Sequence, residues 1–280
     1  MKDVKAIILT GYGLNCDYET YFSLKAAGAV PERVHINEVI SGGRNGTPVS
    51  LDDYHILVLG GGFSWADDHG AGVIMAAKLR YNIGQEIEAF IGKGKLILGI
   101  CNGFQALVNL GLLPGFEGDY RSRRVALTYN DCGNFVDTWV KLKIKEDTVC
   151  AFTKGLSTLE LPVRHGEGKF YAESEVIEQL VEANQVVARY ADEQGKPALG
   201  RWPFNPNGSL DDIAGICDDT GRIFGLMPHP EAFNHYTNHP DWVLKREELA
   251  RAGRRIEKEE GDGIAIFRNA VQYARENLDL

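Results

Sequence analysis

Short apolar runs alternate with segments of helical spacing in the first part of the chain. Continuous apolar runs of this length are typical of strands that are buried on both faces of a parallel sheet. Glycines punctuate the pattern and mark the ends of the helices. We expect strands at 5–10, 33–40, 54–59 and 95–100, and helices at 18–27, 71–91 and 102–110.

The rest of the chain follows a different pattern. Residues 136–145 alternate between apolar side chains and lysines, which is typical of a half-exposed antiparallel strand. Further strands are expected at 186–190, 213–217 and 222–227, and a final helix at 264–278. The pattern predicts an α/β fold with a doubly wound, mostly parallel sheet that carries antiparallel additions. We expect one domain over 1–280, with a polar insertion at about 234–261 before the last helix.

Composition and charge argue against several classes of protein. The chain has 30 Lys and Arg against 39 Asp and Glu, a net charge of −9, which argues against nucleic acid as the main partner. No stretch approaches the roughly 20 apolar residues of a membrane helix, and the apolar run near the N-terminus is too short for a signal peptide. The five cysteines are odd in number and form no CxxC pair, so we expect neither a metal site nor a disulfide framework. Free cysteines are typical of a reducing compartment, and we therefore expect a cytoplasmic location.

One cysteine stands where a nucleophile would be placed. Cys101 lies between a predicted strand and a predicted helix in Gly99-Ile100-Cys101-Asn102-Gly103, the strand–turn–helix pattern of a nucleophile elbow. The helix that starts at Asn102 points its positive end at the thiol and stabilises a thiolate. The Asn102 N–H can face a developing oxyanion. The other four cysteines are interpreted as small buried residues.

A base and a carboxylate that orients it are expected far downstream. In Pro228-His229-Pro230-Glu231, the two prolines favour an extended backbone that places His229 and Glu231 on one side. The separation from the nucleophile is 229 − 101 = 128 residues, so only the fold can bring this pair to Cys101.

Other histidines offer alternatives. His165 is a rival base because Glu167 stands two positions away, and we interpret it as a residue at the edge of the site or a structural residue. His235 and His239, which we expect in a loop, could suggest a metal, but no third ligand is evident and no metal site is predicted.

A glycine run follows the third predicted strand. In a parallel sheet, the loop Gly60-Gly61-Gly62-Phe63 would lie at the same edge as Cys101. The backbone N–H of Gly62 or Phe63 could then bind a carbonyl oxygen. The lysine and hydroxyl of a phosphate-binding loop are missing, and a simple turn is the alternative interpretation.

These motifs together resemble those of the class I, or triad, glutamine amidotransferases, which have a flavodoxin-like fold. The elbow around Cys101 and the run 228–231 carry the resemblance to the class. Within the class, the segments 13–17, 165–168 and 205–209 are similar to loops of the glutaminase subunits of phosphoribosylformylglycinamidine synthases.

The resemblance implies a set of site residues. The catalytic residues would be Cys101 as nucleophile, His229 for proton transfer and Glu231 to orient His229. Oxyanion and glutamine contacts would come from Gly62, Phe63, Asn102 and Gln105. His165 and Asn207 would lie at the edge of the site or at the interface with a partner.

The resemblance also implies a partner and a place in metabolism. Ammonia released from L-glutamine would pass to a synthetase subunit that uses ATP and Mg²⁺ to make formylglycinamidine ribonucleotide in de novo purine biosynthesis. A small third subunit would complete the complex, and this chain would need no cofactor of its own.

Two other functions are kept open. A stand-alone γ-glutamyl Cys hydrolase of the same architecture would need neither the 165–168 nor the 205–209 loop. A non-enzymatic binding subunit on this fold would be expected to lose part of the triad, and all three triad residues are present.

Overall fold

The computed structural model describes residues 3–42, 46, 48–256 and 259–280. The strands are β1 Lys5–Thr10, β2 Val30–His35, β3 Ile56–Leu59, β4 Leu96–Ile100, β5 Ala126–Tyr129, β6 Val136–Ile144, β7 Thr158–His165, β8 Glu167–Tyr171, β9 Val186–Ala191, β10 Ile213–Cys217 and β11 Ile223–Leu226. The α-helices are α1 Asp17–Ala26, α2 Ile36–Ile40, α3 Val73–Gly92, α4 Asn102–Leu110, α5 Ser174–Glu182, α6 Trp242–Arg251 and α7 Ile264–Asn277.

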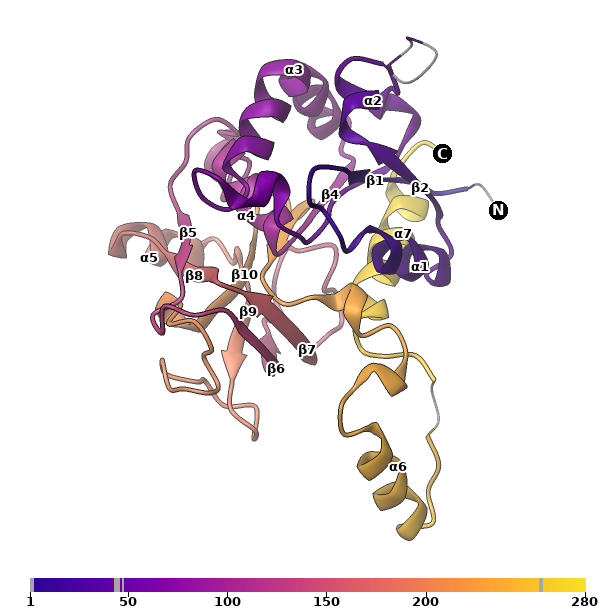
Figure 1. The fold of residues 1–280 in the computed structure, drawn as a ribbon, viewed down its shortest axis with the longest axis vertical. Helices are drawn as coiled ribbons and strands as arrows, with labels where there is room; N and C mark the ends of the chain where they lie inside the picture. The colour runs from indigo at the N-terminus through magenta and orange to yellow at the C-terminus, as the bar shows by residue number, and fades with distance from the viewer. Residues whose placement is uncertain (1–2, 43–45, 47, 257–258) are drawn as a thin grey trace.

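Nine of these strands form one sheet in the order β2-β1-β3-β4-β11-β10-β9-β6-β7 (Figure 1). The first five are parallel to one another, and the following four pair antiparallel. β5 and β8 form a separate antiparallel pair. This arrangement confirms the predicted fold class, a mostly parallel sheet with antiparallel additions.

The connections explain why helices cover both faces of the parallel strands. The chain leaves β1 toward β2 in one direction, and it leaves β3 toward β4 in the other. Right-handed crossovers in opposite directions place their helices on opposite faces. Accordingly α1 packs against α7, whereas α3 packs against α4. The strands β1, β3 and β4 are buried almost throughout, as their apolar runs predict.

Some expected elements are wrong. The strand predicted at 33–40 stops at His35, and Ile36–Ile40 form a short helix instead. The reason is a local cap: the His35 side chain accepts a hydrogen bond from the Asn37 N–H, and the Glu38 carboxylate accepts one from the His35 N–H. The strands β5, β7 and β8 and the helix α5 are not in the prediction.

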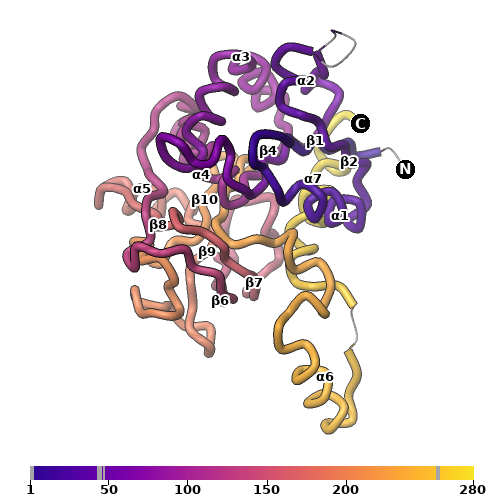
Figure 2. The backbone as a smooth tube through the Cα atoms, viewed as in Figure 1, coloured from indigo at the N-terminus to yellow at the C-terminus, as the bar shows by residue number. Residues whose placement is uncertain are grey.

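The polar segment expected at 234–261 contains α6, which projects away from the body of the protein (Figures 1 and 2). No residue of α6 is buried. The base of this arm is fixed by His239, which is buried and lies against the rings of Trp139 and Phe233. Among the helices that the structure describes, none has the length and apolarity to cross a membrane.

Two glycines in helices allow the close packing of α4 against β3 to be tested by its effect on stability. A Cβ on Gly103, in α4, would lie 1.8 Å from the Leu59 carbonyl oxygen, whereas a Cβ on Gly84, in α3, meets no atom within 4 Å. We predict that Gly103→Ala lowers the free energy of unfolding by about 3 kcal/mol. Gly84→Ala should leave it unchanged or raise it by up to about 1 kcal/mol. Urea denaturation of both variants checks this, and equal effects would contradict the close approach of α4 to β3.

Candidate active site

The thiol of Cys101 is held at a strained turn between β4 and α4. Cys101 has a φ of 51°, a left-handed conformation that is costly for a residue with a side chain. Its N–H donates to the Leu226 carbonyl at 2.9 Å, which continues the β4–β11 ladder into the turn. The turn is tight enough that a Cβ on Gly99 would lie 2.8 Å from the Gly103 carbonyl oxygen. The side chain is 5% exposed, and Sγ lies 3.8 Å from the Arg164 carbonyl oxygen.

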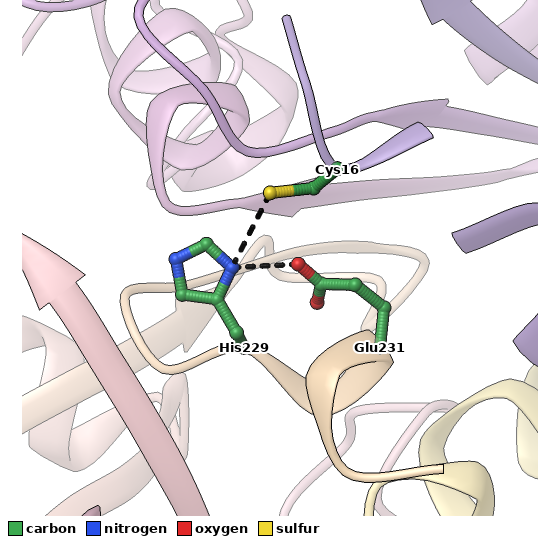
Figure 3. Close-up of side chains that lie close together, drawn as sticks. All are labelled: Cys16, His229 and Glu231. Atoms are coloured by element: carbon green, nitrogen blue, oxygen red, sulfur yellow. Dashed lines mark hydrogen bonds and ion pairs between the residues drawn. The ribbon is translucent and has the colours of Figure 1, made fainter. Parts of the chain in front are cut away.

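His229 and Glu231 form a buried pair beside this thiol. Nδ1 of His229 lies 2.6 Å from Oε1 of Glu231, and the two side chains are 3% and 1% exposed (Figure 3). The His229 N–H donates to the Pro162 carbonyl at 2.8 Å, which ties the loop after β11 to β7. The expected extended backbone holds at His229 only, because Pro230–Ala232 form a 3₁₀ turn that brings Glu231 back to the imidazole.

The charges of this pair favour the imidazolium. Burial acts to lower the pKa of His229, but the negative charges of Glu231 and Cys101 raise it well above its ordinary value. Nε2 of His229 has no hydrogen-bond partner among the described residues and is the nitrogen free to exchange a proton with Cys101. The arrangement therefore fits a thiolate–imidazolium pair with a carboxylate behind it.

A second thiol lies at the same imidazole. Sγ of Cys16 is 3.9 Å from Nδ1 of His229, on the same ring nitrogen that Glu231 contacts (Figure 3). Burial raises the pKa of the Cys16 thiol. The interpretation of Cys16 as an ordinary buried residue is wrong because it is half-buried and faces the site. It is also wrong for Cys132, which is exposed.

The glycine loop lies over the histidine. A Cβ on Gly61 would lie 2.7 Å from Cε1 of His229, so only glycine fits there. The Phe63 N–H donates to the Gly13 carbonyl at 2.9 Å and is therefore not free to bind an oxyanion. Gly62, whose φ is 145°, remains the candidate donor in this loop.

Asn102 and Gln105 hold the surroundings of the elbow together. The Asn102 amide donates to Asp67 at 2.9 Å, and its oxygen accepts the Ser64 N–H at 3.3 Å. The Gln105 amide donates to the Glu167 carbonyl. These bonds join the start of α4 to the loop after β3 and to β8.

His165 belongs to a neutral polar network. Its Nδ1 donates to the Asn130 oxygen at 3.1 Å, and its Nε2 accepts from the Asn207 amide at 3.5 Å. Burial and, to a smaller extent, the nearby positive charge of His229 lower the pKa of His165 to about 3. Asn207 also donates to the Gly168 carbonyl at 2.8 Å. This geometry joins His165 and Asn207 in one buried network, and the low pKa of His165 does not suit it for the role of base.

A cavity of about 510 Å³ is lined by two residues that bond the start of α4: Asp67, which accepts from Asn102, and Glu167, whose carbonyl accepts from Gln105. Asp67, Arg123 and Glu167 line it, so it presents both signs of charge. Burial raises the pKa of Asp67 to about 6, with a further contribution from the charge of Glu167. Sequence reasoning missed Asp67 and gave Glu167 no role of its own, because neither stands in a motif with Cys101.

The fold and this geometry define a class: a Cys-His-Glu hydrolase with its nucleophile on the elbow of a doubly wound sheet. Residues 3–274 match the family described as CobB/CobQ-like glutamine amidotransferase domain. The chain belongs to this glutamine amidotransferase family and, within it, to the PurQ subunits of phosphoribosylformylglycinamidine synthase.

Three relatives illustrate the similarity. The chain is 44% identical over 269 residues to a PurQ subunit of Methanococcus maripaludis, covering 96% of this chain and 97% of the relative. It is 45% identical over 276 residues to a PurQ subunit of Dehalococcoides mccartyi, covering 99% and 100%. Among solved structures, PurLQS from Thermotoga maritima aligns with a TM-score of 0.67 at 29% identity, over 97% of this chain and 99% of that chain.

The raised pKa of Asp67 predicts a pH-dependent stability. Its folded pKa lies above the ordinary value of 3.8, so the folded state holds the proton more tightly than the unfolded state does. Stability is therefore lost as the pH rises from about 4 to about 6. We predict that Asp67→Asn, which keeps an acceptor for Asn102, removes this loss. Unfolding by urea at pH 4 and pH 7 checks it: the variant should gain stability relative to the parent only at pH 7.

Proposed function

We propose that this chain hydrolyses L-glutamine to glutamate and ammonia through a thioester on Cys101, and supplies the ammonia to a synthetase subunit. The synthetase would make formylglycinamidine ribonucleotide in de novo purine biosynthesis, in keeping with relatives that are subunits of phosphoribosylformylglycinamidine synthase. One observation carries the chemistry: parallel pairing of Leu226 with Ile100 places the loop that bears His229 beside the turn that bears Cys101.

The reaction proceeds in two halves. The Cys101 thiolate attacks the side-chain amide carbon of glutamine, and the N–H groups of Asn102 and Gly62 bind the oxygen of the tetrahedral intermediate. The imidazolium of His229 gives its proton to the leaving nitrogen, and ammonia departs as the thioester forms. Neutral His229 then takes a proton from water, which attacks the thioester and releases glutamate. Glu231 holds the ring and balances its charge throughout.

We assign the amino-acid end of glutamine to the cavity beside Gln105. The α-ammonium and α-carboxylate groups of a zwitterion need opposite charges close together, and Asp67, Glu167 and Arg123 supply them there. Gln105 links this cavity to the elbow, because it lies one helical turn after Cys101 and bonds the Glu167 carbonyl. Asp67 and Glu167 would thus select an amino acid over a simple amide.

The partner follows from the relatives. The comparison structure from Thermotoga maritima is that of PurLQS, a name that combines PurQ with PurL and PurS. We propose that a synthetase and a small third subunit bind this chain in the same way, in the cytoplasm. ATP and Mg²⁺ would be used by the synthetase, and this chain would need no cofactor. This assembly is favoured over a stand-alone hydrolase or a non-enzymatic subunit, since the triad is complete and the named relatives are PurQ subunits.

We further propose that the α6 arm, residues 234–261, contacts the synthetase. The arm starts and ends beside the site: the Asn234 amide donates to the Glu231 carbonyl at 2.9 Å, and the Gly261 N–H donates to the Asn234 carbonyl at 3.1 Å. α6 leaves Val243 and Leu244 50% and 58% exposed, which is apolar surface suited to an interface. Trp242 packs on Tyr236 and Arg246 within the arm, so it stiffens the arm more than it anchors a partner.

The assignment of glutamine hydrolysis to this chain and of synthesis to the synthetase is tested with Cys101→Ala in the assembled complex. The variant should lose glutamine-dependent synthesis by at least about 10³-fold, because no thioester can form. It should retain synthesis from added ammonium chloride, since the synthetase performs that step. Cys132→Ala, at an exposed cysteine outside the triad, serves as control and should keep both activities. Loss of the ammonia-dependent activity in an intact complex would contradict the proposal.

The arm is tested with the double substitution Val243→Glu and Leu244→Glu. Both residues are exposed, so the chain should fold normally, and the affinity for the synthetase should fall about tenfold or more. Tyr81→Glu, on α3 at 86% exposure, is the matched control and should bind normally. Affinity is measured by calorimetry, and coupling by the ratio of ammonia used to glutamine hydrolysed. Unchanged affinity and coupling would show that the arm does not form the interface.

A further inference from the structure

Cys16, His229 and Glu231 form a compact cluster of metal-ligating atoms. The Cys16 sulfur, a His229 ring nitrogen and a Glu231 carboxylate oxygen all lie within 4.8 Å of one another. They come from the start of α1 and from the loop after β11, and they converge on one point (Figure 3). The other oxygen of Glu231, Oε2, is buried and has no hydrogen-bond partner within the described part of the chain.

The donor set is that of zinc. Thiolate, imidazole and carboxylate are its usual protein ligands, and bonds of about 2.0–2.3 Å put tetrahedral ligands roughly 3.5 Å apart. The distance from Cys16 Sγ to His229 Nδ1 is 3.9 Å, close to that spacing. The distance from Nδ1 to Oε1 of Glu231 is 2.6 Å, so the carboxylate must move outward or present Oε2. Three protein ligands would leave the fourth position to water.

We propose that Cys16, His229 and Glu231 form an inhibitory site for Zn²⁺. Cys16 is the one ligand of this site that has no part in the proposed triad. Binding releases the thiol proton of Cys16 and the Nδ1 proton of His229 to solvent. The zinc ion then binds Nδ1 of His229 in place of the proton shared with Glu231. The imidazole loses the hydrogen bond that orients it, and it no longer carries a positive charge. Cys101 is not a ligand in this arrangement, so its thiol stays free of the metal.

The inhibition rests on the proposed glutaminase function, but the binding does not, so each is measured separately. In the full-length Cys101→Ala chain, titration with Zn²⁺ alone in a calorimeter should show one site. Adding Cys16→Ser in that background should weaken binding at least about tenfold. Adding Cys132→Ser instead should leave it unchanged. Circular dichroism and thermal melting of each variant establish that it is folded before titration.

Glutamine hydrolysis by the assembled complex provides the second measurement. Zn²⁺ should inhibit it reversibly, with recovery on adding a chelator, and Cys132→Ser should be inhibited as the parent is. Cys16→Ser should need at least about tenfold more Zn²⁺ for half-inhibition of its own activity. Equal zinc affinity with and without Cys16 would overturn the proposal. Loss of the site in Cys101→Ala would also overturn it, because the ion would then bind the catalytic thiol.

Discussion

The parallel pairing of β4 with β11 is the interaction on which the site depends. Ile100 and Leu226 are direct partners although 226 − 100 = 126 residues separate them. All four antiparallel strands of the sheet lie within that interval, and the chain then returns to insert β11 between β4 and β10. Because both strands end at the same edge, the two loops that follow them must meet. The meeting of the Cys101 turn with the His229 loop is therefore a consequence of sheet register, and a slip of one residue would turn these side chains to the opposite face.

Glycines in α4 and in β11 let the helix α4 pack closely on the sheet. A Cβ on Gly225 would lie 2.0 Å from the ring of Phe104, and one on Gly103 would meet the Leu59 carbonyl. α4 thus lies nearly in contact with the backbones of β3 and β11. This proximity aims the N-terminus of α4 at the thiol of Cys101, and it requires glycine at positions where any other residue would push the helix outward.

Local sequence patterns predict the helices and strands whose formation depends on residues close together in the chain. The strand 96–100, the turn at Cys101 and the helix 102–110 follow from an apolar run, small residues and the stop at Gly111. β7 was missed because Pro162 lies within it, yet an edge strand tolerates proline. That same proline offers the carbonyl that positions His229. Cys16 was misread for a related reason: its neighbour in space is 213 residues away, and no local period records such a contact.

Two histidines lie near each other at this site, and their surroundings give them opposite protonation states. His229 has the carboxylate of Glu231 at 2.6 Å, which compensates the cost of burying a cation. His165 has only amide partners, Asn130 and Asn207, which satisfy one N–H and one lone pair of a neutral ring. A second cation here would be both unpaired and close to the first, which is why the pKa of His165 falls to about 3. The neutral ring can therefore pack against Gly168 and order the 165–168 and 205–209 loops, while the favourable surroundings for a positive charge are left to His229.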